Sequence, residues 1–152
     1  MERTTQGQDV SFIAEDMFAR KIVTQQEKEA IVKNREMAEA FLQTPLYERM
    51  LKAQRVLREQ SFNLQAEAQS IGFEGKEKML VQGILDLAFL EEGSWVLLDY
   101  KTDRVDEKTV EKVARGYALQ LDLYARALTD ITGIPVKQKY LYFMRIQKCI
   151  EV

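Results

Sequence analysis

Apolar side chains recur at helical spacing through the first 54 residues. Thr24, followed three positions later by Glu27, has the form of a capping box, in which both side chains satisfy free amides at a helix start. The apolar stripe that follows predicts a helix over residues 25–43, and a Thr-Pro step predicts a shorter helix over residues 44–53. A further helix is predicted near residues 10–17, after a polar tail.

After residue 53 the spacing becomes that of strands. Residues 56–66 place apolar side chains among polar ones and predict a strand. Two densely apolar runs follow, residues 79–90 and 95–100, separated by the turn sequence Glu-Glu-Gly-Ser. This is the pattern of a hairpin whose strands are covered on both faces.

The last third of the chain predicts one long helix and one strand. The helix covers about residues 107–130, with room for a bend at Gly116, and alternating residues 136–146 predict the strand. A glycine and a proline between the two elements stop the helix. The order of helices, strand, hairpin, helix and strand predicts an α/β fold, in which the N-terminal helical segment, residues 1–54, belongs to the same domain as the core, residues 55–152.

The composition indicates one folded domain and excludes several kinds of chemistry. The 152 residues are 46% apolar and 30% charged, which suits a single globular core. The chain has no histidine, so catalytic triads, Cys–His dyads and zinc sites with imidazole ligands are excluded within it. Its single cysteine, Cys149, fits a reducing compartment, so we expect a cytoplasmic protein in which this thiol packs as an apolar group. The sequence has no phosphate-binding loop motif and no apolar run of about 18 residues, which excludes a nucleotide site of its own and a membrane span.

Charge leaves the class of partner open. With 22 basic and 24 acidic residues the net charge is −2, so a broadly basic coat for nucleic acid is absent. Two local clusters of basic residues remain, each interleaved with acids: Arg49, Lys52, Arg55 and Arg58, and then Lys101, Arg104, Lys108, Lys112 and Arg115. A solvated surface and a groove that follows phosphates fit these clusters equally well.

Two carboxylates stand inside the two most apolar predicted strands. Asp86 and Asp99 are each flanked by apolar residues, although aspartate is disfavoured in strands and costly to bury. If the hairpin turns at Glu92 and Gly93, the register brings Asp86 directly opposite Asp99 on one face of the sheet. Like charges repel at that separation, so we expect a cation between them.

The sequence allows two cations at this place. Lys101 lies two positions after Asp99 and so on the same face, and one interpretation is a structural Asp–Lys pair at the strand end. The other is a magnesium or manganese ion held by Asp86, Asp99 and the backbone carbonyl of Tyr100, completed by water and a phosphate oxygen. Such a site would support metal-assisted hydrolysis of phosphodiesters. From these residues alone both interpretations remain open.

Four short motifs, in order along the chain, resemble the signature of the PD-(D/E)XK nuclease superfamily and, within it, of the RecB-like branch. Gly83–Asp86 is similar to the G-x-x-D strand of this branch, and Asp99–Asp103 is similar to its D-Y-K-T segment. Gln120–Tyr124 matches Q-x-x-x-Y, and Glu59–Phe62 is similar to an E-x-P-F segment, with serine in place of proline. The likeness extends into the helical segment and is to the C-terminal nuclease domains of AddAB-type helicase–nucleases.

The resemblance implies a fold, an activity and roles for particular residues. The fold is a restriction-endonuclease-like core, a mixed central sheet with a hairpin, flanked by helices, and the activity is that of a magnesium-dependent DNA exonuclease. By this resemblance Asp86 and Asp99 bind the catalytic metal. Lys101 orients or polarises the attacking water and steadies the phosphate, and Glu59 supports the same site.

Gln120 and Tyr124 lie four positions apart, so they share one face of the predicted helix beside an apolar stripe that includes Tyr117. The resemblance implies that both contact DNA or the active-site strand. A glutamine bonded to the backbone at the edge of the core, with a tyrosine packed by its ring, is the alternative.

The resemblance also implies partners. These are DNA, an AddB-like second subunit, and the helicase part of the same polypeptide, through which ATP would be used. RecB-like nucleases commonly carry a histidine on the first helix, and this chain has none, so we expect it to be part of a longer protein. Two alternatives remain: a DNA-binding or assembly module that keeps the fold without cleaving, and a phage-type or restriction-like nuclease acting alone.

Overall fold

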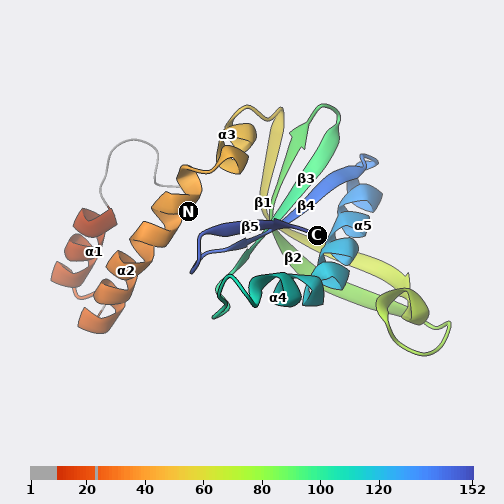
Figure 1. Cartoon of the computed structure of the whole chain (residues 1–152), viewed down its shortest axis with the longest axis horizontal. Coiled ribbons are helices and arrows are strands. Elements are labelled where there is room, and N and C mark those ends of the chain that lie inside the picture. The colour runs from red at the N-terminus through yellow and green to blue at the C-terminus, as the bar shows by residue number, and fades with distance from the viewer. Residues whose placement is uncertain (1–9, 23) are drawn as a thin grey trace. The chain divides into compact units, whose positions relative to one another are not determined.

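A computed structural model of the chain describes residues 10–22 and 24–152 (Figure 1). The predicted polar tail and the side chain of Glu27, half of the predicted capping box, lie outside the described part. The chain divides into two compact units, one ending at Thr44 and one running from Pro45 to Val152. The grouping of residues 1–54 with the core in one domain stays a prediction.

The described residues of the first unit form a pair of helices. Helix α1 covers Val10–Ala19 and helix α2 covers Gln25–Leu42, which confirms the two predicted helices. The helices contact each other, and Nζ of Lys28 in α2 donates a hydrogen bond of 2.9 Å to the carboxylate of Glu15 in α1. The polar and ionic contacts of this pair are mostly exposed, as expected for amphipathic helices.

The second unit is a five-stranded sheet with helices. Helix α3, Pro45–Leu51, precedes the sheet. The strands are β1 (Arg55–Glu67), β2 (Lys78–Glu91), β3 (Ser94–Lys101), β4 (Val136–Phe143) and β5 (Lys148–Glu151), and they lie in the order β1-β2-β3-β4-β5. Neighbouring strands are antiparallel except β3 and β4, which are parallel because a helical crossover connects them. The predicted α/β fold with a mixed sheet is therefore confirmed.

The hairpin between β2 and β3 has the predicted register. Residues pair from Leu87 with Leu98 to Glu91 with Ser94. Glu92 and Gly93 form the turn, with φ of 51° and 75°, as a two-residue hairpin loop requires. The turn sequence and the two apolar runs were sufficient to fix this pairing.

The crossover contains two helices rather than one. Helix α4 covers Val110–Gly116 and helix α5 covers Ala118–Thr132, with the break at Tyr117, next to the predicted bend. The helix begins three residues later than predicted because the Asp106 carboxylate accepts hydrogen bonds from the backbone N–H groups of Lys108 and Thr109, both of 2.9 Å. These bonds hold a turn just before α4. A short 3₁₀ helix, η1 (Ala68–Ile71), connects β1 toward β2.

The last predicted strand, residues 136–146, is wrong at its end. Strand β4 stops at Phe143, and the chain turns and returns as β5, which was not predicted. The turn contains no glycine, and Gln147 takes the left-handed conformation in its place, with φ of 53°. The sequence therefore gives no turn signal at this place.

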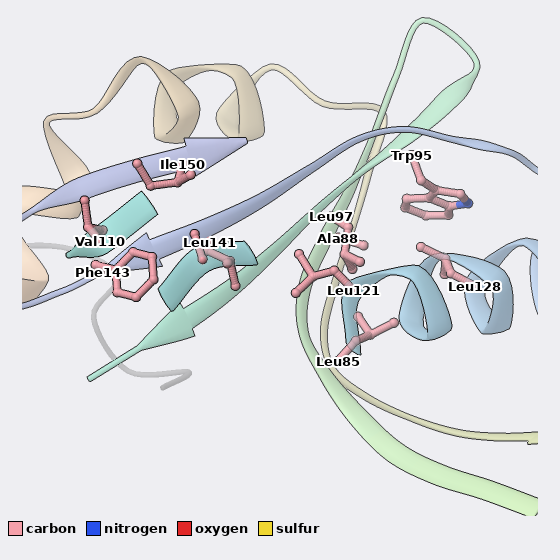
Figure 2. Packing of buried hydrophobic residues seen from close by; sticks show 11 residues of the cluster. Leu85, Ala88, Trp95, Leu97, Val110, Leu121, Leu128, Leu141, Phe143 and Ile150 are labelled. Atoms are coloured by element: carbon pink, nitrogen blue, oxygen red, sulfur yellow. The ribbon is translucent and has the colours of Figure 1, made fainter. Parts of the chain in front are cut away.

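The main core lies between the sheet and helices α4 and α5 (Figure 2). Its largest members come from β3, β4 and α5 and are at most 1% exposed: Trp95, Leu97, Leu141, Phe143, Leu121 and Leu128. The indole N–H of Trp95 donates a hydrogen bond of 3.0 Å to Oγ1 of Thr132, so the one polar atom of this ring has a partner. Helix α5 is thereby fixed along β3, where Asp99 and Lys101 lie.

An ionic network connects helix α3 to strands β2 and β4. The Arg49 guanidinium donates hydrogen bonds of 3.0 and 2.7 Å to the two carboxylate oxygens of Glu91 and lies over the Phe89 ring, with 5.8 Å from Cζ to the centroid. Nζ of Lys137 lies 2.7 Å from the same carboxylate. These cations hold the pKa of Glu91 at about 2, below its ordinary value of 4.5. Arg49 thus has a structural role, and the choice between a solvated surface and a phosphate groove stays open for its cluster.

Replacing Glu91 with glutamine is expected to make the free energy of unfolding less dependent on pH in acid. Because the folded-state pKa of Glu91 is lowered, its contribution is present above about pH 4.5 and is lost as the pH falls toward 2. We expect Glu91→Gln to cost about 1–2 kcal/mol at neutral pH, since the side chain is 24% exposed and partly screened. Urea unfolding at neutral pH and near pH 3 measures this gap. A gap of equal size at both pH values would contradict the prediction.

Candidate functional site

The alternation of side chains between the two faces of the sheet is interrupted in β1 at Glu59 and in β2 at Asp86. In β1, Leu57 packs against the main core, but beyond Glu59 it is Phe62 that packs against helix α5. Alternate residues of a strand share a face, so one extra residue has been accommodated between them. Glu59 is that residue: its φ is 48°, and the ladder omits it between Arg58 and Gln60.

The same irregularity occurs in β2, directly opposite. Leu85 and Ala88 both belong to the main core, which strict alternation would not allow. The register of β1 and β2 is unchanged on either side, with Arg58 paired to Leu87 and Gln60 to Leu85. The two strands thus gain one residue each at the same level. The result is a local opening of the ladder at Asp86.

Asp86 is half-buried beside the end of the β2–β3 ladder. The pairing stops at Leu87 and Leu98, one step before the predicted pair of Asp86 and Asp99. Instead, Oδ2 of Asp86 accepts a hydrogen bond of 2.9 Å from the backbone N–H of Tyr100. The carboxylate therefore lies against the end of β3.

Asp99 is the only buried charged residue in the described part of the chain, with 4% of its surface exposed. Its Oδ2 atom lies 2.6 Å from Nζ of Lys101, but this ion pair lacks hydrogen-bond alignment, and Oδ2 accepts no other hydrogen bond from the described residues. Burial raises the pKa of Asp99; Lys101 opposes this increase, and repulsion from Asp86 adds to it. Asp86 is thus close enough to disfavour the charge of Asp99.

Lys101 lies at the centre of a set of contacts between β3 and α5. Besides the ion pair with Asp99, its Nζ donates a hydrogen bond of 2.8 Å to Oε1 of Gln120. It also lies over the Tyr117 ring, 3.8 Å from the centroid. The side chain is 12% exposed. The ammonium group is therefore held in one place by one charged and two neutral partners.

Gln120 and Tyr124 share one face of α5 in the structure. Nε2 of Gln120 donates a hydrogen bond of 3.0 Å to the Tyr124 hydroxyl. The Tyr124 ring packs edge-on against Phe62 of β1, with centroids 5.2 Å apart. The predicted pair thus connects the sheet to Lys101.

Gly83 has a steric reason to be a glycine. A Cβ atom there would lie 2.7 Å from Cζ of Phe62 and 3.4 Å from Cε1 of Tyr124. Any larger residue would push into the Phe62 and Tyr124 rings. The glycine of the G-x-x-D motif therefore leaves room for the packing behind Gln120.

Tyr117 and Asp103 also belong to this site, although the sequence pattern does not indicate it. The apolar stripe predicts a core position for Tyr117; it does pack against the core, but the face of its ring contacts Lys101. Its hydroxyl donates a hydrogen bond of 2.9 Å to Oδ1 of Asp103. The spacing of three residues between Tyr117 and Gln120 could have shown that both lie on the same helix face.

Asp86 and Asp99 suit a hard divalent cation, but they supply only part of its ligands. Carboxylate oxygens are the ligands that magnesium and manganese prefer, and a buried Asp99 oxygen without a hydrogen bond beside Asp86 fits that chemistry. Within residues 10–22 and 24–152, no three His, Cys, Asp or Glu side chains gather as metal ligands. Glu59 is exposed and opposite Asp86 in the register, so its role at the site stays a prediction, as does that of the Tyr100 carbonyl.

The second basic cluster extends from the site onto the surface. Lys101 is in the site, while four further residues are exposed: Arg104, Lys108, Lys112 and Arg115. No helix of the described residues is both long and apolar enough to cross a membrane. The choice between a solvated surface and a phosphate groove stays open for these four residues.

Comparison with known proteins gives a consistent family. A family model described as the PD-(D/E)XK nuclease superfamily matches residues 1–149. An ATP-dependent helicase/nuclease subunit of Syntrophomonas wolfei is 40% identical over 139 residues, which is 90% of this chain and 11% of that protein. The proteins that bear the same name in Clostridium acetobutylicum and Carboxydothermus hydrogenoformans are 35% identical over 91% of the chain and 44% identical over 72%. The chain spans 10–11% of the length of these relatives.

Proposed function

The chain belongs to the PD-(D/E)XK nuclease superfamily, and from this premise we propose that it is the metal-dependent DNA exonuclease domain of an AddAB-type helicase–nuclease. Such an enzyme would act on DNA ends in double-strand break repair and recombination. One observation carries the proposal: the buried Asp99 lies in an ion pair with Lys101 and within the electrostatic reach of Asp86. Buried acids with perturbed pKa values are typical of functional sites.

Three groups of this chain would hold the cation. They are the carboxylates of Asp86 and Asp99 and the backbone carbonyl of Tyr100, with water and a phosphate oxygen as the remaining ligands. The chemistry supplied by bound Mg²⁺ or Mn²⁺ is activation of water and neutralisation of charge on the phosphate.

Lys101 would act electrostatically rather than as a proton carrier. Its ammonium group is held beside the two carboxylates, where it can orient the attacking water and stabilise the charge that develops on the phosphate. Gln120 and Tyr124 would keep it there and contact the DNA, and Glu59 would support the site from β1.

The proposed partners follow from the relatives. The substrate is DNA, and the remainder of a helicase–nuclease polypeptide would use ATP to move it. An AddB-like protein would complete the enzyme. The four exposed basic residues that follow Lys101 would bind the phosphates of an incoming strand.

Binding of a divalent cation tests the proposal without an activity assay. We expect Mg²⁺ or Mn²⁺ to raise the thermal unfolding temperature of the chain, by the equivalent of about 2–3 kcal/mol at 100 times the dissociation constant. Asp99→Asn should remove this stabilisation, because the variant lacks one of two charged ligands. Differential scanning calorimetry with increasing metal concentration measures the effect.

Asp122→Asn is the matched control. Asp122 is an exposed aspartate of α5 paired with Lys139, so its loss should change the starting stability but leave the metal effect intact. A wild-type chain whose stability does not respond to either cation would favour the alternative function, a DNA-binding or assembly module that keeps the fold without cleaving.

A further inference from the structure

We propose that Tyr117 is a positioning residue for Lys101. The inference rests on the proposed function, since it assumes that the placement of the Lys101 ammonium matters for cleavage. Tyr117 does not belong to the functional positions assigned from the sequence motifs. The observation that carries the proposal is the 3.8 Å approach of Nζ to the centroid of the Tyr117 ring.

The ring provides attraction without charge. A cation over the face of an aromatic ring is attracted by the ring quadrupole, most strongly where water is excluded. Lys101 is 12% exposed and Tyr117 is half-buried, so this contact lies in such a place. The ring therefore holds the ammonium group through a contact that carries no charge of its own.

The neutral partners of Lys101 matter because Asp99 can pair either with Lys101 or with a divalent cation. In the structure Lys101 is the counter-ion of Asp99, yet the same carboxylate is proposed to bind a divalent cation. When Asp99 is engaged in that way, Lys101 loses its charged partner. The Tyr117 ring and the Gln120 carbonyl oxygen stay available, and they would keep the ammonium group beside the phosphate.

The position of Tyr117 is itself determined by its surroundings. Its backbone lies at the break between α4 and α5: its N–H bonds to the Ala114 carbonyl, and its carbonyl accepts the N–H of Leu121. Its hydroxyl donates to Asp103, which follows β3 by two residues. The ring is thus anchored at both ends, one in the crossover and one beyond the strand that carries Lys101.

Tyr117→Leu and Tyr117→Phe separate a positioning role from simple packing. We expect Tyr117→Leu, in the complete helicase–nuclease, to lower kcat for DNA cleavage by about 10-fold while KM for DNA and ATP hydrolysis stay unchanged. Tyr117→Phe keeps the ring and should retain activity within about 3-fold of wild type. Tyr140→Leu, a tyrosine of β4 bonded to Glu151 away from Lys101, is the matched control and should have no effect.

A spectroscopic measurement provides a readout that does not depend on cleavage. In NMR spectra of the chain, the Lys101 side-chain CH₂ protons nearest Nζ should be shifted upfield by the Tyr117 ring. Tyr117→Leu should remove that shift and Tyr117→Phe should keep it. A shift that is absent in wild type, or unchanged in Tyr117→Leu, would overturn the inference whatever the activities are.

The activity outcomes distinguish the two proposals. If Lys101→Met leaves cleavage intact, the proposed function of the site fails. If Lys101→Met abolishes cleavage while folded Tyr117→Leu cleaves like wild type, only the role of Tyr117 fails. If Tyr117→Phe is impaired as strongly as Tyr117→Leu, the ring face is not responsible, and the inference is likewise overturned. Thermal unfolding of each variant verifies that it is folded.

Discussion

Lys101→Met is expected to reduce DNA cleavage by about 100- to 1000-fold, because the variant loses the positive charge next to the reacting phosphate. Removal of a single preorganised electrostatic group has effects of this size in other active sites. Methionine keeps most of the length and apolar volume of the lysine stem. The measurement is the rate of DNA degradation by the complete helicase–nuclease, with ATP hydrolysis and unwinding as internal references.

A loss of stability must be separated from this loss of activity. Without Lys101, the buried Asp99 would keep no charged partner, and we expect Lys101→Met to destabilise the fold by about 3 kcal/mol. The double variant Lys101→Met/Asp99→Asn removes both charges and should recover most of that stability. It should nevertheless remain inactive. A stable and active double variant would contradict the assignment of both residues.

Lys139→Met is the matched control for the loss of a lysine. Lys139 lies in β4 and pairs with the exposed Asp122, so its charge is engaged away from Lys101. This variant should cleave like wild type. Equal losses in Lys139→Met and Lys101→Met would mean that charge in general, rather than the position of Lys101, sets the rate.

The hairpin and its register could be predicted because local and global signals agree there. The Glu92–Gly93 turn admits positive φ, and the two apolar runs leave only one alignment that covers both strands. This alignment alone was enough to bring Asp86 and Asp99 to the same end of the hairpin. The lysine two positions later then followed from strand periodicity.

The features that were missed depend on contacts between distant segments. Strand β5 follows a turn with Gln147, not glycine, in the left-handed conformation. Pairing with β4 holds this turn, as do hydrogen bonds from Met144 and Arg145 to the carbonyls of Lys101 and Thr102. The irregularity at Glu59 leaves the register of β1 and β2 unchanged on both sides, and in the sequence it shows only as a change in the alternation between Leu57 and Phe62. Tyr117 looks like a core residue because it is one, and its second role appears only when α5 is placed beside β3.

Gly83→Ala is the second variant with a large expected effect, on stability and on the site together. The new Cβ would meet the Phe62 ring at 2.7–2.9 Å, and Phe62 is 4% exposed, so the ring cannot move into solvent. It would press on Tyr124, whose hydroxyl accepts the hydrogen bond from Gln120. We expect a loss of about 2 kcal/mol in unfolding free energy, the usual cost of overpacking.

The structure also predicts which second change relieves the strain. In Gly83→Ala/Phe62→Leu the smaller leucine removes the ring atoms that the new methyl group would meet, so the double variant should be more stable than the sum of the two single changes predicts. Gly116→Ala is the control: its Cβ would meet no atom within 4 Å, and alanine favours the helix there. Urea unfolding of the wild type, Gly83→Ala, Phe62→Leu and the double variant gives the coupling energy. Strictly additive effects would mean that the absence of a side chain at Gly83 is not what accommodates Phe62.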